Sequence, residues 1–252
     1  MDILATLHAM ADEADAIALS YFQNTTLRVE DKPDHSPVSE ADLAIETRIR
    51  ELSIRALPGY TIWGEEFGLE NPTASHKLII DPIDATRNFI RGLPFFATLL
   101  AIEEEGCIVA GLVSAPATQD RWCAAVHQGA YHNNQRIHVS TTSDLSQSQA
   151  FYGSLYGSEA ETLPLNTVLN LLSKTSRQRG IGDYYGHMLT AMGCGEFTLD
   201  FGLKPWDIAP IKIIVEEAGG KVTNLNGEFS LKNGDIVTSN GTLHSTLLDF
   251  LA

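Results

Sequence analysis

The 252-residue chain is poor in basic residues and in long apolar segments. Its 17 Lys and Arg stand against 32 Asp and Glu, which gives a formal charge of −15. Phosphate backbones are bound by clustered Lys and Arg, so this deficit argues against a nucleic-acid partner. No apolar run approaches the roughly 18–20 residues of a membrane span, and the N-terminus lacks a signal-peptide pattern. We therefore expect no membrane partner and a cytoplasmic location.

Cysteine is also scarce. Cys107, Cys123 and Cys194 are odd in number, far apart and without a CxxC pair. This pattern indicates neither a disulfide framework nor a zinc site. We expect all three to be buried small hydrophobic side chains with no catalytic role. An acidic chain without these features can still bind a phosphate ester if it first binds cations.

The length of the chain suggests one or two domains. Apolar periodicity predicts that they contain both helices and strands. Helical spacing over residues 3–22, and again from Ser39 to Pro58, predicts two helices before any sheet, with a polar stretch between them. Strand-like runs from Tyr60 to Val126 predict an antiparallel sheet. A turn-rich segment then suggests a boundary near residue 142. We predict an N-terminal α+β domain over 1–142 and a C-terminal α/β domain over 143–252.

Strands and helices are expected to alternate in the second half. The expected elements are strand Gln149–Tyr152, helix Thr162–Lys174, a short strand before Gly182, helix Tyr184–Met192, strand Glu196–Leu199, helix Trp206–Ala218, strands near Lys221–Thr223 and Ile236–Thr238, and helix Leu243–Leu251.

Four acids stand in apolar or turn settings where an unpaired charge would be costly: Glu65, Asp81, Asp84 and Asp207. Several carboxylates without a His or Cys partner suit a hard divalent cation such as Mg²⁺, which prefers oxygen ligands. Two such ions can polarise a phosphoryl oxygen and activate a water. Thr86, beside the cluster, offers a hydroxyl that could orient that water, and the short helix after Asp84 would direct N–H groups at a phosphate.

Local chemistry leaves other interpretations open. Asp84 could be only the N-cap of a helix over Ala85–Ile90, and Asp207 only a charge at a helix N-terminus. Asp42 fits the capping box that begins at Ser39. A pair of carboxylates acting as general acid and base is an alternative to metal binding. The spacing alone does not separate these functions.

Three motifs, in order, resemble the signatures of the inositol monophosphatase family. They are Gly64-Glu65-Glu66, Asp81-Pro82-Ile83-Asp84-Ala85-Thr86-Arg87-Asn88-Phe89, and Trp206-Asp207-Ile208-Ala209-Pro210 with Glu217-Ala218-Gly219-Gly220 after it. The resemblance covers essentially the whole chain. It implies a layered αβαβα sandwich like that of inositol monophosphatases and fructose-1,6-bisphosphatases. It also implies a Mg²⁺-dependent, lithium-sensitive phosphomonoesterase that acts on a small phosphorylated metabolite as a homodimer.

The resemblance further implies a set of metal ligands. Glu65, Asp81 and the Ile83 carbonyl would hold one Mg²⁺, and Asp81, Asp84 and Asp207 would hold a second. Glu65 would also touch a weaker third ion. The family thus implies two or three ions per active site.

Further roles follow from the same resemblance. Asp42 falls where the family has an acid that hydrogen-bonds the motif threonine, so Asp42 and Thr86 would together activate the attacking water, with Glu66 as a supporting residue. The chain departs from the family where Ala85-Thr86 replaces the usual Gly-Thr. Ala85 therefore predicts a backbone conformation open to a residue with a Cβ, since only Gly reaches positive φ freely. We still expect its N–H to face the phosphate.

Other segments resemble the histidinol-phosphate phosphatase branch: Ser36-Pro37-Val38-Ser39-Glu40-Ala41-Asp42, Phe89-Ile90-Arg91-Gly92-Leu93-Pro94 and Gly182-Asp183-Tyr184-Tyr185-Gly186. Histidinol phosphate carries an amine and an imidazole, which carboxylates outside the metal cluster should recognise. Asp183 and Asp200 are the candidates for binding this substrate, as Ala85 and Thr86 are for its phosphate. A helix N-cap for Asp183 and a surface strand end for Asp200 are the structural alternatives, and His187 is expected to have no catalytic part.

Three functions remain open. The first is hydrolysis of histidinol phosphate. The second is hydrolysis of inositol 1-monophosphate, of a 3'(2'),5'-bisphosphate nucleotide or of a sugar phosphate. The third is a weakly catalytic family member that acts through protein or RNA contacts. The acidic charge and the complete ligand set argue against the third.

Overall fold

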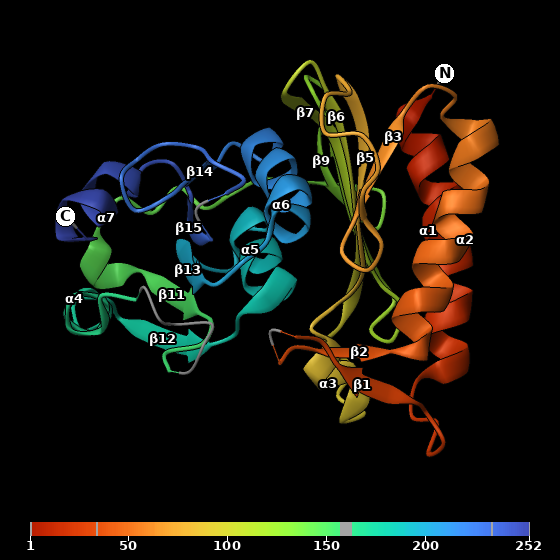
Figure 1. Cartoon of the computed structure of the whole chain (residues 1–252). Helices are drawn as coiled ribbons and strands as arrows, with labels where there is room; N and C mark the ends of the chain where they lie inside the picture. Colours follow the sequence, from red (N-terminus) through yellow and green to blue (C-terminus); the bar gives the residue numbers. More distant parts are fainter. Residues whose placement is uncertain (1, 34, 157–162, 233, 252) are drawn as a thin grey trace.

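A computed structural model describes residues 2–33, 35–156, 163–232 and 234–251. The layers follow the expected αβαβα order, in which two sheets alternate with three layers of helices (Figure 1). The helices are α1 (Ile3–Tyr21) and α2 (Glu40–Ala56) outside the first sheet, α5 (Asp183–Ala191) and α6 (Pro205–Glu217) between the sheets, and α4 (Leu165–Leu172) and α7 (His244–Leu251) outside the second. Among the described residues, no helix has the length and apolarity needed to cross a bilayer.

The first sheet has eight strands in the order β10-β9-β8-β7-β6-β5-β3-β4. These strands are β3 (Thr61–Gly64), β4 (Gly68–Leu69), β5 (His76–Asp84), β6 (Ala97–Glu104), β7 (Cys107–Ala115), β8 (Asp120–Ala125), β9 (Gly129–His132) and β10 (Gln135–Ile137). The expectation of a purely antiparallel sheet was wrong at one pair, because β3 and β5 run parallel. The short strand β4 folds back on β3 and reverses the chain before β5 begins.

The second sheet has five strands in the order β12-β11-β13-β15-β14. They are β11 (Gln149–Tyr152), β12 (Arg177–Gly180), β13 (Phe197–Phe201), β14 (Lys221–Thr223) and β15 (Asp235–Ser239). The strand β11 runs parallel to both of its neighbours, so their carboxyl ends meet at one edge. The alternation expected from the sequence is confirmed. The predicted helix Thr162–Lys174 is observed from Leu165 to Leu172, and Thr162 itself lies outside the described residues.

A small antiparallel hairpin between α1 and α2 was missed. It pairs β1 (Val29–Asp31) with β2 (Pro37–Ser39), so the expectation that two helices precede any sheet was wrong. All three residues of β1 are exposed. Such a strand has no buried face and therefore no apolar alternation by which to detect it. The hairpin matters because the loop that follows β1 carries Lys32 to the functional site.

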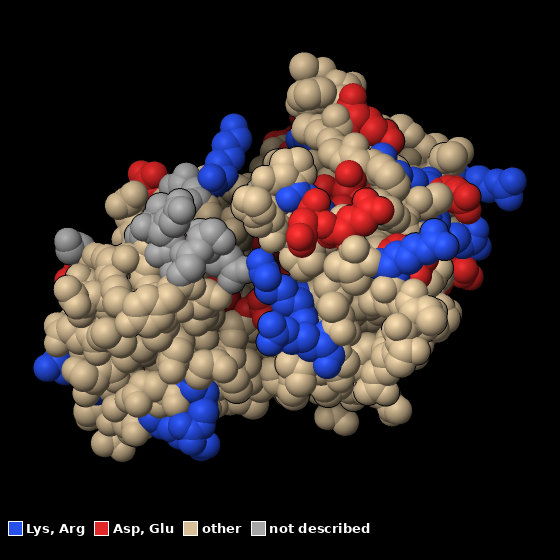
Figure 2. Space-filling model, turned by 60° about the horizontal axis from the view of Figure 1, so that its bottom comes forward, with Lys and Arg blue, Asp and Glu red and all other residues tan. Residues whose placement is uncertain are grey.

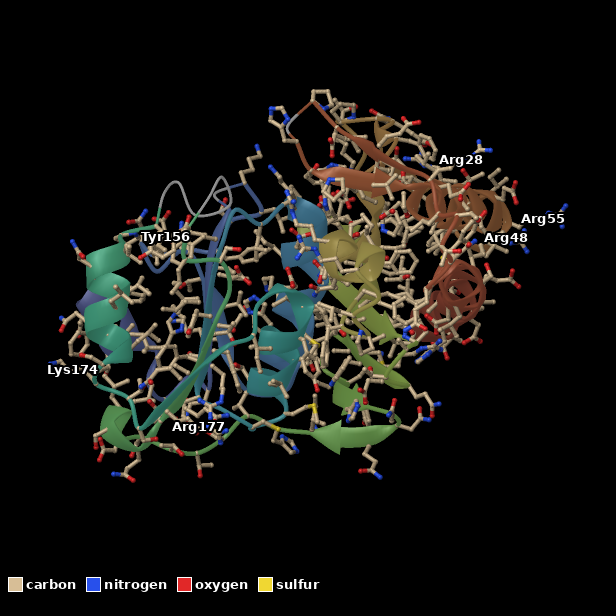
Figure 3. The ribbon with its side chains drawn as sticks, turned by 90° about the horizontal axis from the view of Figure 1, so that it is seen from below. Arg28, Arg48, Arg55, Tyr156, Lys174 and Arg177 are labelled. Atoms are coloured by element: carbon tan, nitrogen blue, oxygen red, sulfur yellow. The ribbon has the colours of Figure 1, made fainter. Side chains whose placement is uncertain are left out.

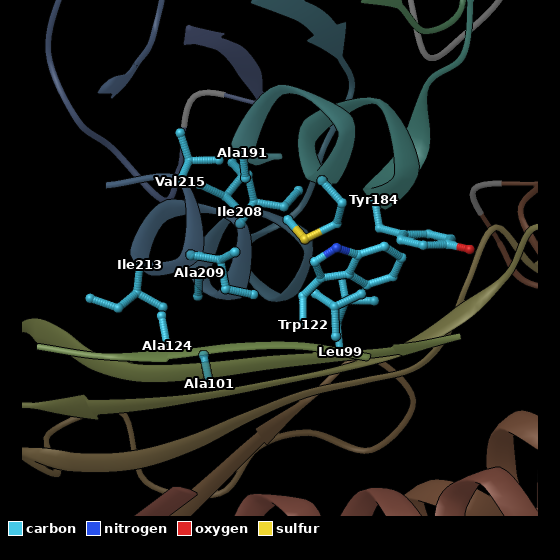
Figure 4. Close-up of a cluster of buried hydrophobic side chains, with 14 of the residues drawn as sticks. Leu99, Ala101, Trp122, Ala124, Tyr184, Ala191, Ile208, Ala209, Ile213 and Val215 are labelled. Atoms are coloured by element: carbon cyan, nitrogen blue, oxygen red, sulfur yellow. The ribbon is translucent and has the colours of Figure 1, made fainter. Parts of the chain in front are cut away.

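Two apolar cores lie on opposite faces of the first sheet. One packs α1 and α2 against it, and the other packs α5 and α6 against it. Figure 4 shows the second core, where Ile213 of α6 lies over Ala124, and Tyr184 of α5 lies beside Trp122. Gly111 of β7 allows this close approach, since a Cβ there would come within 2.6 Å of Ile213 Cγ2. The core thus joins residues from both sides of position 142, and the division into two domains stays a prediction.

The cysteines differ from expectation. Cys123 is buried, whereas Cys107 and Cys194 are exposed. Cys107 begins β7 directly after a turn, and Cys194 lies in the turn that follows α5, where a small apolar side chain has no core to enter. The expectation of three buried thiols was therefore wrong for two of them.

Candidate active site

The predicted acids meet at a cleft of about 760 Å³ at the ends of β5, β11, β12 and β13. Asp42 and the supporting residue Glu66 do not line the cleft, whereas the other candidates named from the sequence do: Glu65, Asp81, Ile83, Asp84, Ala85, Thr86, Asp183, Asp200 and Asp207. Figure 2 shows carboxylate atoms in the depth of a hollow with basic side chains at its rim. The site draws on both halves of the chain, so neither half contains it alone.

Asp81 and Asp84 owe their common direction to a β-bulge. Residues three apart on a regular strand point to opposite faces of a sheet. Between Asp81 and Asp84, however, β5 advances three residues while its partner β6 advances two, from Leu99 to Ala97. The extra residue turns both carboxylates to the same side. Asp207 joins them from the first turn of α6, and one oxygen of each acid lies within 4.8 Å of the others.

Burial makes this cluster unfavourable without a cation. All three acids are at most 8% exposed, and Asp81 Oδ1 is buried with no hydrogen-bond partner. Burial, with Glu65 and Asp207 nearby, raises the pKa of Asp81 well above its ordinary value, and burial raises the pKa of Asp207 to about 7. A compact, all-oxygen donor set with an unpartnered oxygen fits a hard divalent cation. General acid–base chemistry by a carboxylate pair does not require three acids at this separation.

The capping interpretation holds for Asp207 and was wrong for Asp84, because Ala85 is the N-cap of the helix Thr86–Ile90 and that helix has no side-chain cap. Asp84 serves a different helix. Asp207 Oδ2 accepts a hydrogen bond of 2.7 Å from the Lys204 N–H at the start of α6. Asp84 Oδ2 accepts one of 2.8 Å from the Tyr184 N–H in the first turn of α5. In each case one carboxylate oxygen serves a helix N-terminus, and the second is left for another ligand.

Lys32 lines the cleft although the sequence did not single it out. Its Nζ lies 2.7 Å from Glu65 Oε1 and 2.8 Å from Glu66 Oε1. Burial disfavours the charged ammonium, yet the two glutamates outweigh burial and raise the pKa of Lys32. Burial also raises the pKa of Glu66 to about 7. The only sequence signal was one lysine in a polar loop of an acidic chain.

Thr86 and Asp42 do not form the expected hydrogen bond. The Thr86 hydroxyl donates to the Ile83 carbonyl at 2.9 Å. Asp42 Oδ2 instead accepts from the Ser39 N–H and hydroxyl at 2.8 and 2.6 Å, which is the capping box that local sequence predicted. Tight turns bring a hydroxyl close to the carbonyl three residues before it, and this local partner wins here. Asp42 Oδ1 remains buried without a partner, and burial raises the pKa of Asp42 to about 6.

Ala85 adopts a conformation that the sequence analysis did not expect. Its φ of 65° and ψ of 44° are left-handed, directly before the short helix α3 (Thr86–Ile90). An L-residue with a Cβ reaches this region at a cost of roughly 1–2 kcal/mol. The chain therefore keeps the turn that glycine would form freely. The first amides of α3 remain beside the cleft, which Ala85, Thr86 and Arg87 all line.

Replacing Ala85 with Gly is expected to stabilise the protein by about 1 kcal/mol, because Gly removes the strain of positive φ. The free energy of unfolding from urea titration measures this. Ala16→Gly, at an exposed position inside α1, is the matched control and is expected to destabilise by about 1 kcal/mol. A loss of stability at both positions would show that Ala85 carries no strain.

Asp200 is buried at the end of β13, so its interpretation as a surface residue was wrong. Its Oδ1 accepts from the Phe201 N–H at 2.9 Å and its Oδ2 from the Asp183 N–H at 3.0 Å. The Gly153 backbone packs on this carboxylate, since a Cβ there would lie 2.0 Å from Oδ1. Burial, with Asp183 nearby, raises the pKa of Asp200 well above its ordinary value. A buried acid that lines the cleft is suited to a cationic ligand group.

Asp183 and His187 both lie close to Asp200, in different settings. Asp183 is the first residue of α5 rather than its N-cap, has a φ of 52°, is exposed and lines the cleft. His187 is fully buried one turn further along, where its Nδ1 lies 2.9 Å from Thr238 Oγ1. Burial lowers the pKa of His187 to about 3, so the ring is neutral. It does not line the cleft, which agrees with the expectation that it has no catalytic part.

Comparison with known proteins identifies the family. Residues 2–251 match the inositol monophosphatase family. The chain belongs to that family. A histidinol-phosphatase of Streptomyces coelicolor is 42% identical over 100% of this chain and 97% of its own, and one of Mycobacterium tuberculosis is 36% identical over 98% and 96%. The resemblance to this branch is thus confirmed.

Solved structures agree with the fold of this family member. The extragenic suppressor protein suhB from Bartonella henselae superposes with a TM-score of 0.92 at 27% identity, over 100% of this chain and 98% of its own. An IMPase from Thermotoga maritima gives 0.89 at 29% identity, over 100% and 97%. The expected layered fold is confirmed. The protein is a phosphatase of a metal-dependent family, a phosphoric monoester hydrolase.

Proposed function

We propose that the protein hydrolyses histidinol phosphate to histidinol and phosphate, with Mg²⁺ as its cofactor. One observation carries this proposal: the cleft that holds the Asp81, Asp84 and Asp207 cluster also contains a separate buried carboxylate, that of Asp200. The cluster suits metal ions and phosphate, and Asp200 suits a cationic leaving group. The similarity to two histidinol-phosphatases supports the same substrate.

The metal ligands follow from the donor set. Asp81, Asp84 and Asp207 would hold one Mg²⁺, and Glu65, Asp81 and the Ile83 carbonyl a second, with a third, weaker ion beside Glu65. Bound Mg²⁺ supplies Lewis-acid polarisation of the phosphoryl group and lowers the pKa of a water. A cation also offsets the repulsion between the three buried carboxylates.

Side chains around the cluster bind and orient the phosphate. Lys32 and Lys204 line the cleft and place positive charge at its mouth. By contrast Arg28, Arg48 and Arg55 extend away from it on the outer side of the molecule (Figure 3). The amides at the start of α3 have no acceptor within the helix and are available to phosphate oxygens. The Thr86 hydroxyl lies beside them, where a rotation away from the Ile83 carbonyl would let it orient the attacking water.

Asp200 and Asp183 would recognise the histidinol group. Asp200 is held rigidly by two backbone N–H donors, and Asp183 is adjacent and more exposed. The amine or imidazolium of the substrate beside Asp200 would lower the pKa of this buried acid and favour its ionised form. An uncharged inositol or sugar lacks that pairing, so the cleft should favour a cationic ester.

The test is phosphate release from histidinol phosphate, inositol 1-phosphate, adenosine 3',5'-bisphosphate and fructose 1,6-bisphosphate, each with Mg²⁺ and with EDTA. We expect Mg²⁺-dependent turnover with the highest kcat/KM for histidinol phosphate. A preference for another ester would keep the metal site but reject this substrate. No turnover of any ester would favour the weakly catalytic alternative. The homodimer, the lithium sensitivity and the cytoplasmic location stay predictions.

Mg²⁺ is expected to raise Tm more at about pH 8 than at about pH 5.5. The folded pKa of Asp207, about 7, exceeds an unfolded value of about 3.9. Because the folded state holds this proton more tightly, the metal-free protein loses stability as pH rises between those values. Mg²⁺ replaces the proton, so at acid pH it must compete with protons for the same oxygens.

Thermal melts with and without saturating Mg²⁺ at the two pH values measure this difference. In Asp207→Asn the shift caused by Mg²⁺ is expected to be smaller at both pH values, because one ligand is lost. An equal or larger shift at acid pH in the parent protein would contradict a metal site built from acids with raised pKa.

A further inference from the structure

Glu46 is a fully buried carboxylate outside the cleft that contacts the turn containing Glu65. It lies on α2 one helical turn after Asp42 and one turn before Arg50, so these three side chains follow one face of the helix. Asp42 is explained by its capping box and Arg50 by its ion pairs. Glu46 caps no helix end, and a buried acid in mid-helix is costly unless its hydrogen bonds are made elsewhere.

The partners of Glu46 are the backbone of the turn between β3 and β4. Its Oε2 accepts from the Glu66 N–H at 2.8 Å, and its Oε1 accepts from the Phe67 N–H at 3.2 Å. This turn is three residues long and begins with Glu65, because Gly64 pairs with Gly68 across the hairpin. The carboxylate therefore holds the two amides that directly follow Glu65.

Arg50 completes the clamp. Its Nε and Nη2 donate to Glu46 Oε1 at 2.9 and 2.8 Å, and Nη2 also donates to the Gly68 carbonyl at 3.1 Å. The guanidinium lies over the Phe67 ring, 5.5 Å from its centroid. The turn is thus held at both ends by two side chains of one rigid helix.

Gly64 shows how closely the carboxylate approaches. A Cβ at residue 64 would lie 1.9 Å from Glu46 Oε1, although the φ of Gly64 is not positive. Residue 64 is therefore glycine because the Glu46 carboxylate occupies the space of a side chain, and not because the backbone needs a positive φ. On the other side the Glu65 N–H donates to the Ile80 carbonyl at 3.1 Å, one residue before Asp81. The backbone of Glu65 is fixed between β5 and the Glu46 carboxylate.

We propose that Glu46, supported by Arg50, is a positioning residue that fixes the Glu65–Phe67 turn and thereby sets the affinity of the Glu65 side of the cleft for divalent metal. The inference rests on the proposed function for the role of Glu65 as a metal ligand. Glu46 itself touches neither metal nor substrate. Residues that hold a ligating side chain in place typically contribute about 10–100-fold to metal affinity.

The test is calorimetric titration of the whole protein with Mn²⁺, comparing the parent with Glu46→Gln. Glutamine keeps the shape of the side chain, but its NH₂ group replaces one acceptor oxygen. A donor would then face the backbone N–H or guanidinium donors, and those hydrogen bonds would be lost. We expect one Mn²⁺ site, the one to which Glu65 contributes, to show a Kd raised by about 10–100-fold. At saturating metal, kcat should stay close to the parent value, because no group that touches substrate has changed.

Two further variants serve as a control and as a second test. Glu51→Gln, on the exposed side of the same helix and paired with Arg48, is the matched control and should leave the Kd unchanged. Arg50→Lys keeps the charge but loses the paired contacts, and should raise the Kd in the same direction if Glu46→Gln does not fold. A folded Glu46→Gln or Arg50→Lys variant with the parent Kd would overturn the inference. A parent protein that binds no Mn²⁺ would instead overturn the proposed function.

Discussion

Asp81→Asn is expected to lower kcat/KM for histidinol phosphate by about 10³-fold or more, since its carboxylate would serve both metal ions and its loss removes charge stabilisation that acts on the phosphoryl group. The buried Oδ1 of Asp81 has no protein partner, so no other role explains that oxygen. Steady-state phosphate release at saturating Mg²⁺ measures the effect.

The same substitution should not destabilise the metal-free protein. Asp81 lies among like charges, and the neutral amide removes repulsion from Asp84 and Asp207. We therefore expect an unchanged or higher Tm in EDTA. Asp249→Asn, at an exposed position of the remote helix α7, is the control and should alter neither activity nor Tm. Activity near the parent level in Asp81→Asn would remove this residue from the metal site.

Asp200→Asn is expected to raise KM for histidinol phosphate by about 10–100-fold, the loss typical of one charge-assisted hydrogen bond of about 1.5–3 kcal/mol. The effect should be selective. An uncharged ester such as inositol 1-phosphate does not use the charge, so its KM should change little. Parallel KM measurements on both esters in parent and variant separate recognition from general damage to the site.

The uncharged ester also controls for a structural effect of this substitution. The amide introduced by Asp200→Asn would present an NH₂ group to one of the two N–H donors that now bond to the carboxylate, from Phe201 and Asp183. If that conflict disturbed the cleft, both esters would suffer alike. Equal losses would remove Asp200 from substrate recognition. Asp183→Asn should show a smaller selective loss, because that side chain is exposed.

The long helices and strands could be predicted because each carries a clear period, whereas their layered arrangement was implied by the motif resemblance. The helix α1 buries one apolar stripe, and the strands β6 and β7 bury most of their residues. Burial requires apolar residues at regular positions, and this regularity can be detected in the sequence. The hairpin of β1 and β2 escaped because its first strand buries nothing. Lys32 was missed because it follows this strand in a polar loop, where no apolar pattern marks it. It forms ion pairs with both Glu65 and Glu66.

The residues of the site could be predicted from the resemblance of the motifs to a known family, but not from the spacing of the acids along the chain. Asp81 and Asp84 are three residues apart, so on a regular strand their side chains would point to opposite faces of the sheet. No pattern in the local sequence predicts the β-bulge that brings them to the same side. Conversely, the capping box of Asp42 was correctly predicted from local sequence, while the partner that the family implied for it was wrong in this structure. The burial of Asp200 depends on the packing of Gly153, a contact between distant segments that no local pattern records.

The most direct test of the central claim is anomalous diffraction from crystals of the protein grown with Mn²⁺, which locates each metal ion from its own signal. We expect one peak among the carboxylates of Asp81, Asp84 and Asp207 and a second beside Glu65 and the Ile83 carbonyl. Manganese bound only elsewhere, with the three aspartates free of it at saturating concentration, would contradict the account.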